Sequence, residues 1–225
     1  MSKFNYNMFF DANDSLFNFE VKYSFLEYFL LETLPVESYA RRAYDKYIDK
    51  MNKNILNGAS PCYLSKEYFK NFSGMPVKLM FEIANSWYYK SKLDYKEDFF
   101  NQKVLFEIKM HKRSNAQIVI LSSLFSPCLE VLKEEIFLDA MICSELEVIN
   151  GYYTGNIICD PLVTEGKSEA IKNFLLKQDS NIIDQKDDFS TSNEVNNYFC
   201  DISYDYSDDI INYFSSERFK SLYRN

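Results

Sequence analysis

A short apolar run at residues 8–10 leads directly into a polar cluster, and this feature constrains the fold more than any other. The run reads Met-Phe-Phe, and it is followed by Asp11, Asn13, Asp14 and Ser15. Such a run is typical of a strand buried on both faces of a parallel sheet. Ligands bind where these strands end, so Asp11 is a candidate nucleophile or metal ligand. Helix capping is the alternative, because Asp and Asn side chains accept hydrogen bonds from the first helical turn.

The rest of the chain separates into a helical block and a region where strands and helices alternate. Helical periodicity extends from residue 16 to residue 113, with interruptions predicted at Pro35, 58–61, 74–76 and 92–94. Beyond it, the patterns predict strands at 117–121, 137–142 and 198–200, a hairpin at 145–158 around Asn150-Gly151, and helices at 127–136, 166–176 and 208–214. This order predicts an α/β fold with a parallel sheet and a helical insertion after the first strand.

Composition narrows the possible partners and the compartment. The net charge is −8, so a nonspecific nucleic-acid surface is not expected. The most apolar stretch, 24–34, contains two glutamates and is too short to span a bilayer, and polar residues interrupt the start of the chain where a secretory signal would lie. Five scattered cysteines without a Cys-x-x-Cys pair are expected to be free thiols. We therefore expect a cytoplasmic protein with no nucleic-acid partner and no membrane partner.

The histidine content argues against two further classes of site. The sequence contains one histidine, His111, so neither a Ser-His-Asp triad nor a zinc site with several histidines is supported. His111 lies near the end of a predicted helix, where we expect it to be structural.

Four polar positions stand at predicted strand ends or at a helix start: Asp11, Ser122, Lys167, and Asp201 with Asp205. Each has an ordinary explanation, because a serine after a strand often caps a helix and aspartates often lie at the surface. Lys167 is the most informative of them, since a cation is slightly unfavourable at the beginning of a helix.

Taken in order, these positions resemble the motifs of the haloacid dehalogenase-like (HAD) superfamily, particularly its phosphoserine-phosphatase-like branch. Residues 10–16, Phe-Asp-Ala-Asn-Asp-Ser-Leu, resemble motif one, Phe-Asp-x-Asp-Gly-Thr-Leu. Residues 118–122 resemble motif two, four apolar residues and then Ser or Thr, and residues 165–168 are similar to the lysine segment of motif three. Residues 199–205 resemble motif four, Gly-Asp-x-x-x-Asp, with a cysteine in place of the glycine. The hairpin at 146–155 also resembles the Glu-Val-x-x-Gly-x-Tyr-Thr-Gly stretch of this branch.

The resemblance implies a HAD fold with two parts. A Rossmann-like core would comprise residues 1–15 and 114–225, and residues 16–113 would form an all-helical cap. It also implies that Asp11 is a nucleophile that forms an aspartyl-phosphate, that Ser122 hydrogen-bonds the phosphoryl oxygens, and that Lys167 offsets their charge.

A magnesium ion is implied by the same resemblance. Its ligands would be Asp11, the backbone carbonyl of Asn13, and Asp201, with Asp205 as a further ligand or as the holder of a water molecule; Mg²⁺ prefers oxygen ligands of this kind. The implied substrate is a small phosphorylated metabolite, a phosphomonoester hydrolysed with the help of Mg²⁺.

Asn13 departs from the family pattern. The phosphatases of the family have an aspartate here, which protonates the leaving oxygen and then activates water, and asparagine can do neither. Because general acid–base catalysis contributes roughly 10²–10⁴-fold, turnover of alkyl phosphates should be slow. Other HAD branches, such as the cation-pumping ATPases, also lack this aspartate and still transfer phosphoryl groups.

Two alternatives to a slow phosphatase therefore stay open. One is a catalytically impaired HAD-like protein that binds a phosphorylated metabolite or a partner. The other is a haloacid dehalogenase, which the retained phosphate- and metal-type positions disfavour.

Overall fold

The computed structural model describes residues 4–160, 166–183 and 196–200. Within these residues five strands form one sheet, in the order β4-β3-β2-β1-β5. The elements in chain order are β1 (Tyr6–Asp11), the π-helical turn η1 (Ala12–Leu16), α1 (Val21–Thr33), α2 (Glu37–Leu56), α3 (Pro61–Phe69), η2 (Lys70–Phe72), α4 (Val77–Tyr95), η3 (Lys96–Asp98), α5 (Gln102–Arg113), β2 (Ala116–Phe125), α6 (Ser126–Glu130), α7 (Leu132–Glu135), β3 (Ala140–Ile149), β4 (Tyr152–Cys159), α9 (Gly166–Ile183) and β5 (Asn196–Cys200).

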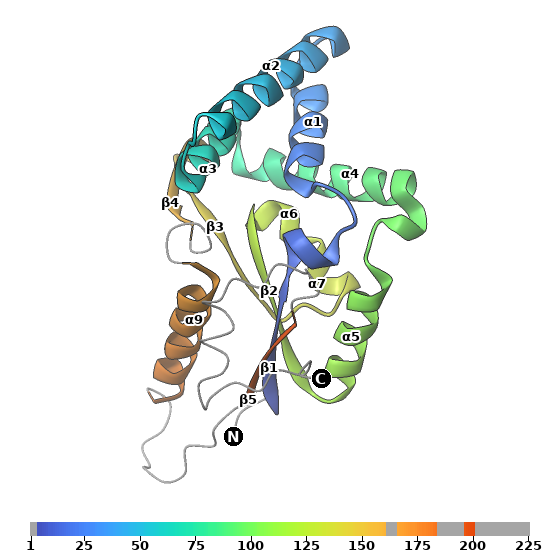
Figure 1. Cartoon of the computed structure of the whole chain (residues 1–225), viewed down its shortest axis with the longest axis vertical. Coiled ribbons are helices and arrows are strands. Elements are labelled where there is room, and N and C mark those ends of the chain that lie inside the picture. The colour runs from blue at the N-terminus through green and yellow to red at the C-terminus, as the bar shows by residue number, and fades with distance from the viewer. Residues whose placement is uncertain (1–3, 161–165, 184–195, 201–225) are drawn as a thin grey trace.

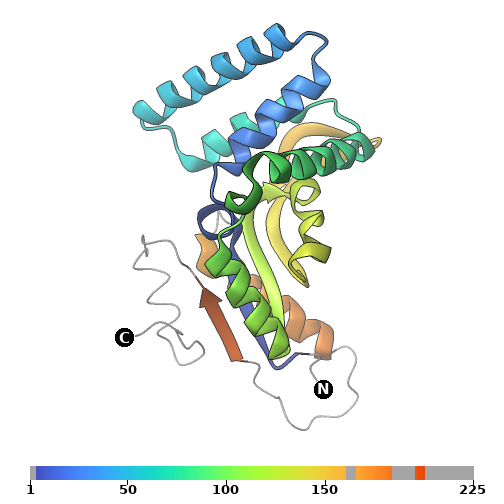
Figure 2. The same cartoon turned by 90° about the vertical axis from the view of Figure 1, so that its right-hand side faces the viewer.

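The central part of the sheet is parallel, which confirms the predicted α/β class. β1 pairs in parallel with β2 on one side and with β5 on the other, and β2 pairs in parallel with β3. β3 and β4 form an antiparallel hairpin at one edge of the sheet. Figures 1 and 2 show α5 and α9 on opposite faces of the sheet.

The side chains of β1 alternate between two hydrophobic clusters, as the pleat of a strand requires. Met8 and Phe10 belong to a large cluster that includes Ile108 of α5. Phe9 belongs to a smaller cluster on the other face, with Ile171 of α9. Burial on both faces explains why the sequence of this strand is continuously apolar rather than alternating.

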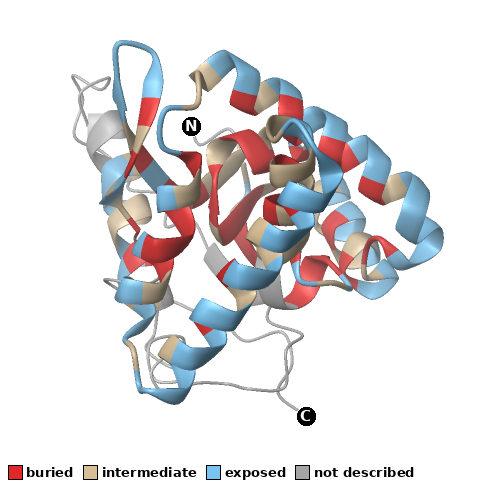
Figure 3. Cartoon of the chain, turned by 90° about the horizontal axis from the view of Figure 1, so that it is seen from above, coloured by how far each residue is buried: buried red, intermediate tan, exposed pale blue. Residues whose placement is uncertain are grey.

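The helices α1 to α4 follow β1 in the sequence and lie above the ends of β1 and β2 in space (Figures 1 and 2). Their buried residues lie on their inner faces, and exposed residues cover the outside (Figure 3). The interruptions predicted at Pro35, 58–61 and 74–76 are confirmed, because α1, α2 and η2 end just before them. The interruption predicted near 92–94 is also present but begins slightly later, since α4 continues to Tyr95 and η3 follows it. No helix in the described part of the chain has the length and apolarity needed to cross a membrane.

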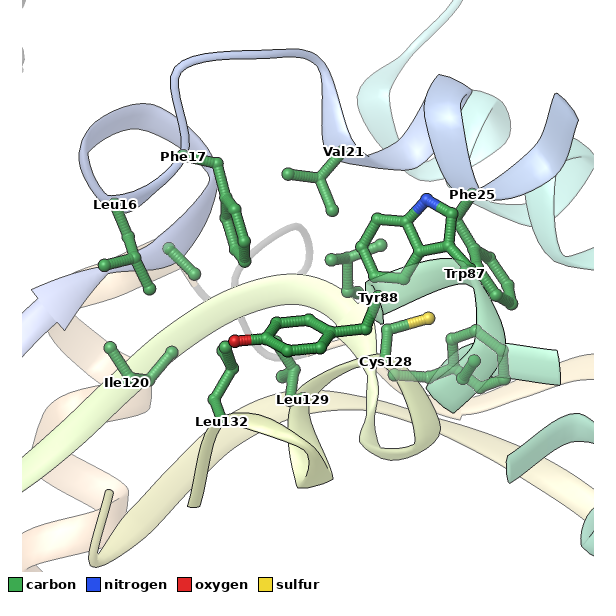
Figure 4. Close-up of a cluster of buried hydrophobic side chains, with 14 of the residues drawn as sticks. Leu16, Phe17, Val21, Phe25, Trp87, Tyr88, Ile120, Cys128, Leu129 and Leu132 are labelled. Atoms are coloured by element: carbon green, nitrogen blue, oxygen red, sulfur yellow. The ribbon is translucent and has the colours of Figure 1, made fainter. Parts of the chain in front are cut away.

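One hydrophobic cluster connects these helices with the sheet. Figure 4 shows Phe25 of α1 beside Trp87 of α4, and Tyr88 between Phe17 above it and Leu129 below it. The rings of Phe25 and Trp87 meet edge to face, with their centroids 5.4 Å apart. The helical region therefore shares a core with the sheet.

The predicted end of the second strand is wrong. β2 continues past Ser122 to Phe125, and its pairing with β3 shifts register between Leu121 and Phe125. The hydroxyl of Ser144 on β3 donates a hydrogen bond to the carbonyl of Ser123 (3.2 Å). The polar Ser-Ser pair therefore forms an irregularity within the strand and does not end it, because β3 continues alongside.

Three other boundaries differ from prediction. The helix expected at 127–136 is divided into α6 and α7 around Val131. The strand expected at 137–142 joins the first arm of the hairpin to form β3. The helix expected at 166–176 extends to Ile183, and the helix expected at 208–214 lies outside the described residues.

The predicted hairpin around Asn150-Gly151 is confirmed. Asn150 and Gly151 have φ angles of 53° and 82°, the positive values that a type I′ turn needs at both central positions. The hairpin also pairs with the segment before α4: the Gly74 N–H donates to the carbonyl of Tyr153 (2.7 Å), and the Val77 N–H donates to the carbonyl of Gly151 (2.9 Å). The hairpin is thus attached to the helical region as well as to the sheet.

Candidate functional site

Asp11 is the last residue of β1 and is 2% exposed. It lies in register with Leu121 of β2, so its neighbour across the sheet immediately precedes Ser122. Its backbone carbonyl accepts a hydrogen bond from the hydroxyl of Ser15, which closes the turn η1 onto the end of the strand. A buried carboxylate at the carboxyl end of a parallel strand lies where ligands bind in open α/β sheets.

Asn13 lies in η1, directly after β1. The turn is anchored from the other side, because the carbonyl of Leu16 accepts a hydrogen bond from the Asn101 N–H (2.9 Å). Phe17 and Phe100 form an isolated antiparallel bridge just beyond it. The segment that leaves the sheet after β1 and the segment that returns before α5 therefore run side by side, close to Asp11. The side chain of Asn13 lies outside the described part of the structure.

Ser122 is fully buried within the irregular part of β2. Its Oγ accepts a hydrogen bond from the N–H of Leu124 (3.1 Å), which stabilises the irregularity. Since Leu121 pairs with Asp11, Ser122 follows at the same edge of the sheet on the neighbouring strand. The structure thus brings two of the predicted site residues, Asp11 and Ser122, to one edge.

Lys167 is the second residue of α9, as the sequence predicted for the beginning of this helix. α9 packs on the sheet face that carries Phe9, where the rings of Phe9 and Phe174 meet edge to face at 6.0 Å. Side chains two apart on a strand share a face, so Asp11 is on the side that α9 covers. The side chain of Lys167 lies outside the described part of the structure.

Asp201 and Asp205 lie outside the described residues. β5 ends at Cys200, which is in register with Phe10, and Asp201 follows Cys200 in the sequence. Among the residues that the structure describes, no three Asp, Glu, His or Cys side chains lie together as a metal site. Asp11 is the one predicted ligand whose side chain the structure describes.

His111 lies on the opposite face of β1 from Asp11, because it contacts the side chains of Tyr6 and Phe10. It hydrogen-bonds through Nδ1 to the hydroxyl of Tyr6 (2.8 Å), at the opposite end of β1. Burial lowers the pKa of His111, and the nearby carboxylate of Glu107 opposes this shift. The contact agrees with the structural role expected for this residue.

Sequence reasoning missed a second polar group, at the contact between the helical region and the hairpin. The hydroxyl of Ser65 on α3 donates a hydrogen bond to Oδ2 of Asp160 (2.5 Å), and these residues are 4% and 2% exposed. Lys22, in the first turn of α1, interacts electrostatically with Asp160. We call Lys22, Ser65 and Asp160 the polar contact. Asp160 directly follows the apolar end of β4, the same pattern that singled out Asp11, so this signal was present in the sequence.

The polar contact lies at the same edge of the sheet as Asp11. Leu121 pairs with both Asp11 and Ile142 of β3, which places these three residues at one level across the sheet. Three residues further along β3, Glu145 pairs with Cys159, and Asp160 comes next. Because β4 runs antiparallel to β3, Asp160 lies beside Ser144, which pairs with Phe125. Asp160 is therefore level with the end of β2 and further along the sheet than Asp11, beneath the helical region.

Comparisons with known proteins agree with this architecture. The haloacid dehalogenase-like hydrolase family model matches residues 8–184. A crystal structure of a protein of unknown function from Bordetella pertussis Tohama I is similar with a TM-score of 0.64 and 15% identity, covering 87% of this chain and 81% of that one. A HAD family hydrolase from Salmonella enterica subsp. enterica serovar Typhi is similar with a TM-score of 0.52 and 12% identity, covering 78% of this chain and 52% of that one.

A substrate-bound phosphoserine phosphatase complex also resembles the chain, with a TM-score of 0.49 and 15% identity, covering 88% of this chain and 79% of that one. No curated protein matches the sequence. At these identities, the likenesses to the Bordetella pertussis and Salmonella enterica structures establish a shared fold.

Proposed function

This chain belongs to the haloacid dehalogenase-like hydrolase family, and from this we propose that it is a Mg²⁺-dependent phosphatase that hydrolyses a small phosphomonoester through an aspartyl-phosphate at Asp11. The observation that carries the proposal is the buried Asp11 carboxylate at the end of β1, with Ser122 at the same edge on β2. An in-line nucleophile beside a hydroxyl donor is what phosphoryl transfer requires of a protein.

The proposed reaction has two steps. An Asp11 carboxylate oxygen attacks phosphorus, and the bond between phosphorus and the ester oxygen breaks with its electron pair moving to the leaving oxygen. Because Asn13 cannot donate a proton, the leaving oxygen takes its proton from water. A second water molecule then attacks the aspartyl-phosphate, which restores the Asp11 carboxylate and releases phosphate.

Ser122 and Lys167 have supporting roles in this proposal. The Ser122 hydroxyl donates a hydrogen bond to a phosphoryl oxygen, and the Lys167 ammonium offsets the negative charge that phosphate adds to Asp11. The position of Lys167 at the beginning of α9, on the helix that covers the Asp11 side of the sheet, supports this role.

The residues at this edge fit a magnesium ion by their donor chemistry. Asp11 offers a carboxylate, Asn13 offers a backbone carbonyl after the strand, and Asp201 and Asp205 follow β5, the strand that pairs with β1. When bound, Mg²⁺ neutralises phosphate charge and orients the transferring group. The buried carboxylate of Asp11 at the end of β1 is the observation that favours a cation here, because carboxylate oxygens are ligands that Mg²⁺ prefers.

We further propose that residues 16–113 act as a cap over a core formed by residues 1–15 and 114–225. The helices α1 to α4 lie above the edge that carries Asp11, and a cover in this place would exclude water and select the substrate (Figure 1).

Asn13 favours a second candidate function. A HAD-like protein without this acid–base residue could retain a phosphorylated metabolite without turning it over. It would then bind the metabolite, or a partner, through the same Asp11 edge.

Phosphate release in the presence of Mg²⁺ distinguishes the two functions. We expect the native chain to hydrolyse p-nitrophenyl phosphate, whose leaving group needs no protonation, and Asp11→Asn to abolish this activity. Asn13→Asp should raise turnover of an alkyl phosphate by roughly 10²–10⁴-fold and have a smaller effect on the aryl ester. Asn57→Asp makes the same chemical change at an exposed position and should alter neither rate. If neither the native chain nor Asn13→Asp releases phosphate from any ester, the enzyme proposal is wrong.

A further inference from the structure

Lys22 lies where the helical region meets the sheet, and the described residues around it do not pair with its charge. It lies in the first turn of α1 and is partly buried. Its ammonium nitrogen is 5.5 Å from the ring centre of Tyr68, and the Tyr68 hydroxyl donates a hydrogen bond to the Lys22 carbonyl (3.0 Å). Tyr68 is itself buried, so this contact fixes the backbone of Lys22 against α3.

The ammonium group of Lys22 has no close anionic partner among the residues that the structure describes. Several other lysines are paired: Lys50 and Lys70 with Glu67, Lys92 with Glu135, and Lys112 with Asp139. For Lys22, no described carboxylate oxygen lies within 4.0 Å of the nitrogen, which is 5.5 Å from the centre of the Tyr68 ring. An ammonium has three donors, and a partly buried one without acceptors is unfavourable.

Electrostatics agree with this geometry. Burial lowers the pKa of Lys22, and the carboxylates of Asp160 and Glu20 oppose the shift without cancelling it. Asp160 is also engaged by the Ser65 hydroxyl. The described carboxylates, Asp160 and Glu20, therefore compensate only part of the lost hydration of this cation.

We propose that Lys22 binds an anionic oxygen group on the leaving-group side of the substrate, so that the substrate is a small phosphomonoester with a second negative charge. The inference rests on the proposed function at Asp11, and it adds the substrate class. It follows from the ammonium of Lys22, which has no ion-pair partner among the described residues and lies with Asp160 at the end of the sheet that carries Asp11. An anion would supply the acceptors that Lys22 lacks, through hydrogen bonds strengthened by charge.

The test uses three phosphate esters of similar size and different charge: phosphoglycolate, 2-hydroxyethyl phosphate and phosphoethanolamine. Their binding is measured by calorimetry, with Mg²⁺, to the full-length chain carrying Asp11→Asn, so that binding is read without turnover. The variants Lys22→Met and Lys22→Glu are added to this background. Lys78→Met is the matched control, because the side chain of Lys78 is 92% exposed.

With Lys22 present, phosphoglycolate should bind about tenfold or more tightly than 2-hydroxyethyl phosphate, as one hydrogen-bonded ion pair predicts. Lys22→Met should remove this preference, and Lys22→Glu should reverse it in favour of phosphoethanolamine. Lys78→Met should change nothing. If Lys22 were purely structural, its substitution would lower the affinity for all three esters equally, and that result would overturn the inference. An unchanged preference among the three esters, or no binding of any of them, would overturn it as well.

Turnover separates this inference from the proposed function. The chain with Asp11 intact is tested for phosphate release from the same three esters and from p-nitrophenyl phosphate. If it releases no phosphate but the binding series follows Lys22, the proposed phosphatase is wrong and the anion site stands. If it releases phosphate without any dependence on the charge at position 22, the anion site is wrong and the phosphatase stands.

Discussion

The helical region meets the sheet through two contacts of opposite chemistry. In the aromatic contact, the ring of Phe125 at the end of β2 lies 5.2 Å from Phe72, 5.6 Å from Phe69 and 5.9 Å from Phe25, measured between centroids. In the polar contact, the Ser65 hydroxyl donates a hydrogen bond to Asp160, and Lys22 interacts with Asp160 electrostatically, without an ion pair. Both contacts are largely buried, but they would respond differently to water.

The difference lies in what each contact loses on opening. Each buried Phe contributes roughly 1.5–3 kcal/mol through its apolar surface, and this is lost when the ring becomes exposed. When the polar contact opens, its hydroxyl, carboxylate and ammonium groups form hydrogen bonds with water instead. The net loss of stabilising free energy is therefore only about 1 kcal/mol per hydrogen bond. We therefore expect the aromatic contact to hold the helical region in place, while the polar contact opens and closes.

The largest effect should come from the aromatic contact. Phe125→Ala removes the ring that contacts three phenylalanines and leaves a cavity, so the free energy of unfolding should fall by about 3–5 kcal/mol. Urea denaturation measures this fall. Phe106→Ala is the control, because Phe106 is 60% exposed and should change stability by less than about 0.5 kcal/mol. A loss near that of the control would show that the aromatic contact does not hold the helical region.

A smaller effect is expected from the polar contact. Ser65→Ala removes the hydrogen bond to Asp160 and should lower the free energy of unfolding by about 1–3 kcal/mol. Amide hydrogen exchange at the beginning of α3 should accelerate in this variant. The hydrogen bond stabilises only the closed state of the polar contact, so its loss makes opening more frequent. Asp160→Asn keeps an acceptor oxygen and should retain more of this protection. Ser73→Ala, at an exposed serine, should leave both quantities unchanged. A loss as large as that of Phe125→Ala would remove the distinction between the two contacts.

The two contacts also show what the sequence could predict. The parallel strand at β1 and the hairpin turn were predictable, because burial on both faces and positive φ at Asn150-Gly151 leave local patterns. The extension of β2 to Phe125 was not, because the polar Ser122-Ser123 pair looks like a strand end and only the pairing with β3 continues the strand.

The same limit applies to the site. Asp11 and Ser122 could be predicted because each is a polar residue after an apolar run, and parallel pairing brings such positions to one edge. The hydrogen bond of Ser65 to Asp160 joins residues that are 95 positions apart, so no local pattern predicts it. The partial burial of Lys22 also has no local signal, because it depends on contacts with Tyr68 of α3.

The smallest effect is expected from Lys22→Met, whose influence on the free energy of unfolding should depend on pH. Burial holds the pKa of Lys22 below its usual value of 10.5, so at pH values between the two the unfolded chain binds a proton that the folded chain does not. Stability therefore rises with pH in this window, and below it the cost of the buried charge is fully present. Lys22→Met removes that cost. Its free energy of unfolding should exceed that of the native chain at pH 7, and the gap should narrow as the pH approaches 10.5.

Urea denaturation at pH 7, 8, 9 and 10 measures this gap. Lys78→Met, at an exposed lysine, should show no gap at any pH, and the loss caused by Phe125→Ala should be independent of pH because no titrating group is removed. A Lys22→Met variant that is less stable than the native chain at pH 7 would show that the ammonium is already well compensated within the protein. In that case the polar contact would be a stabilising ion pair like those of the other lysines, and the reason to expect a substrate anion at Lys22 would disappear.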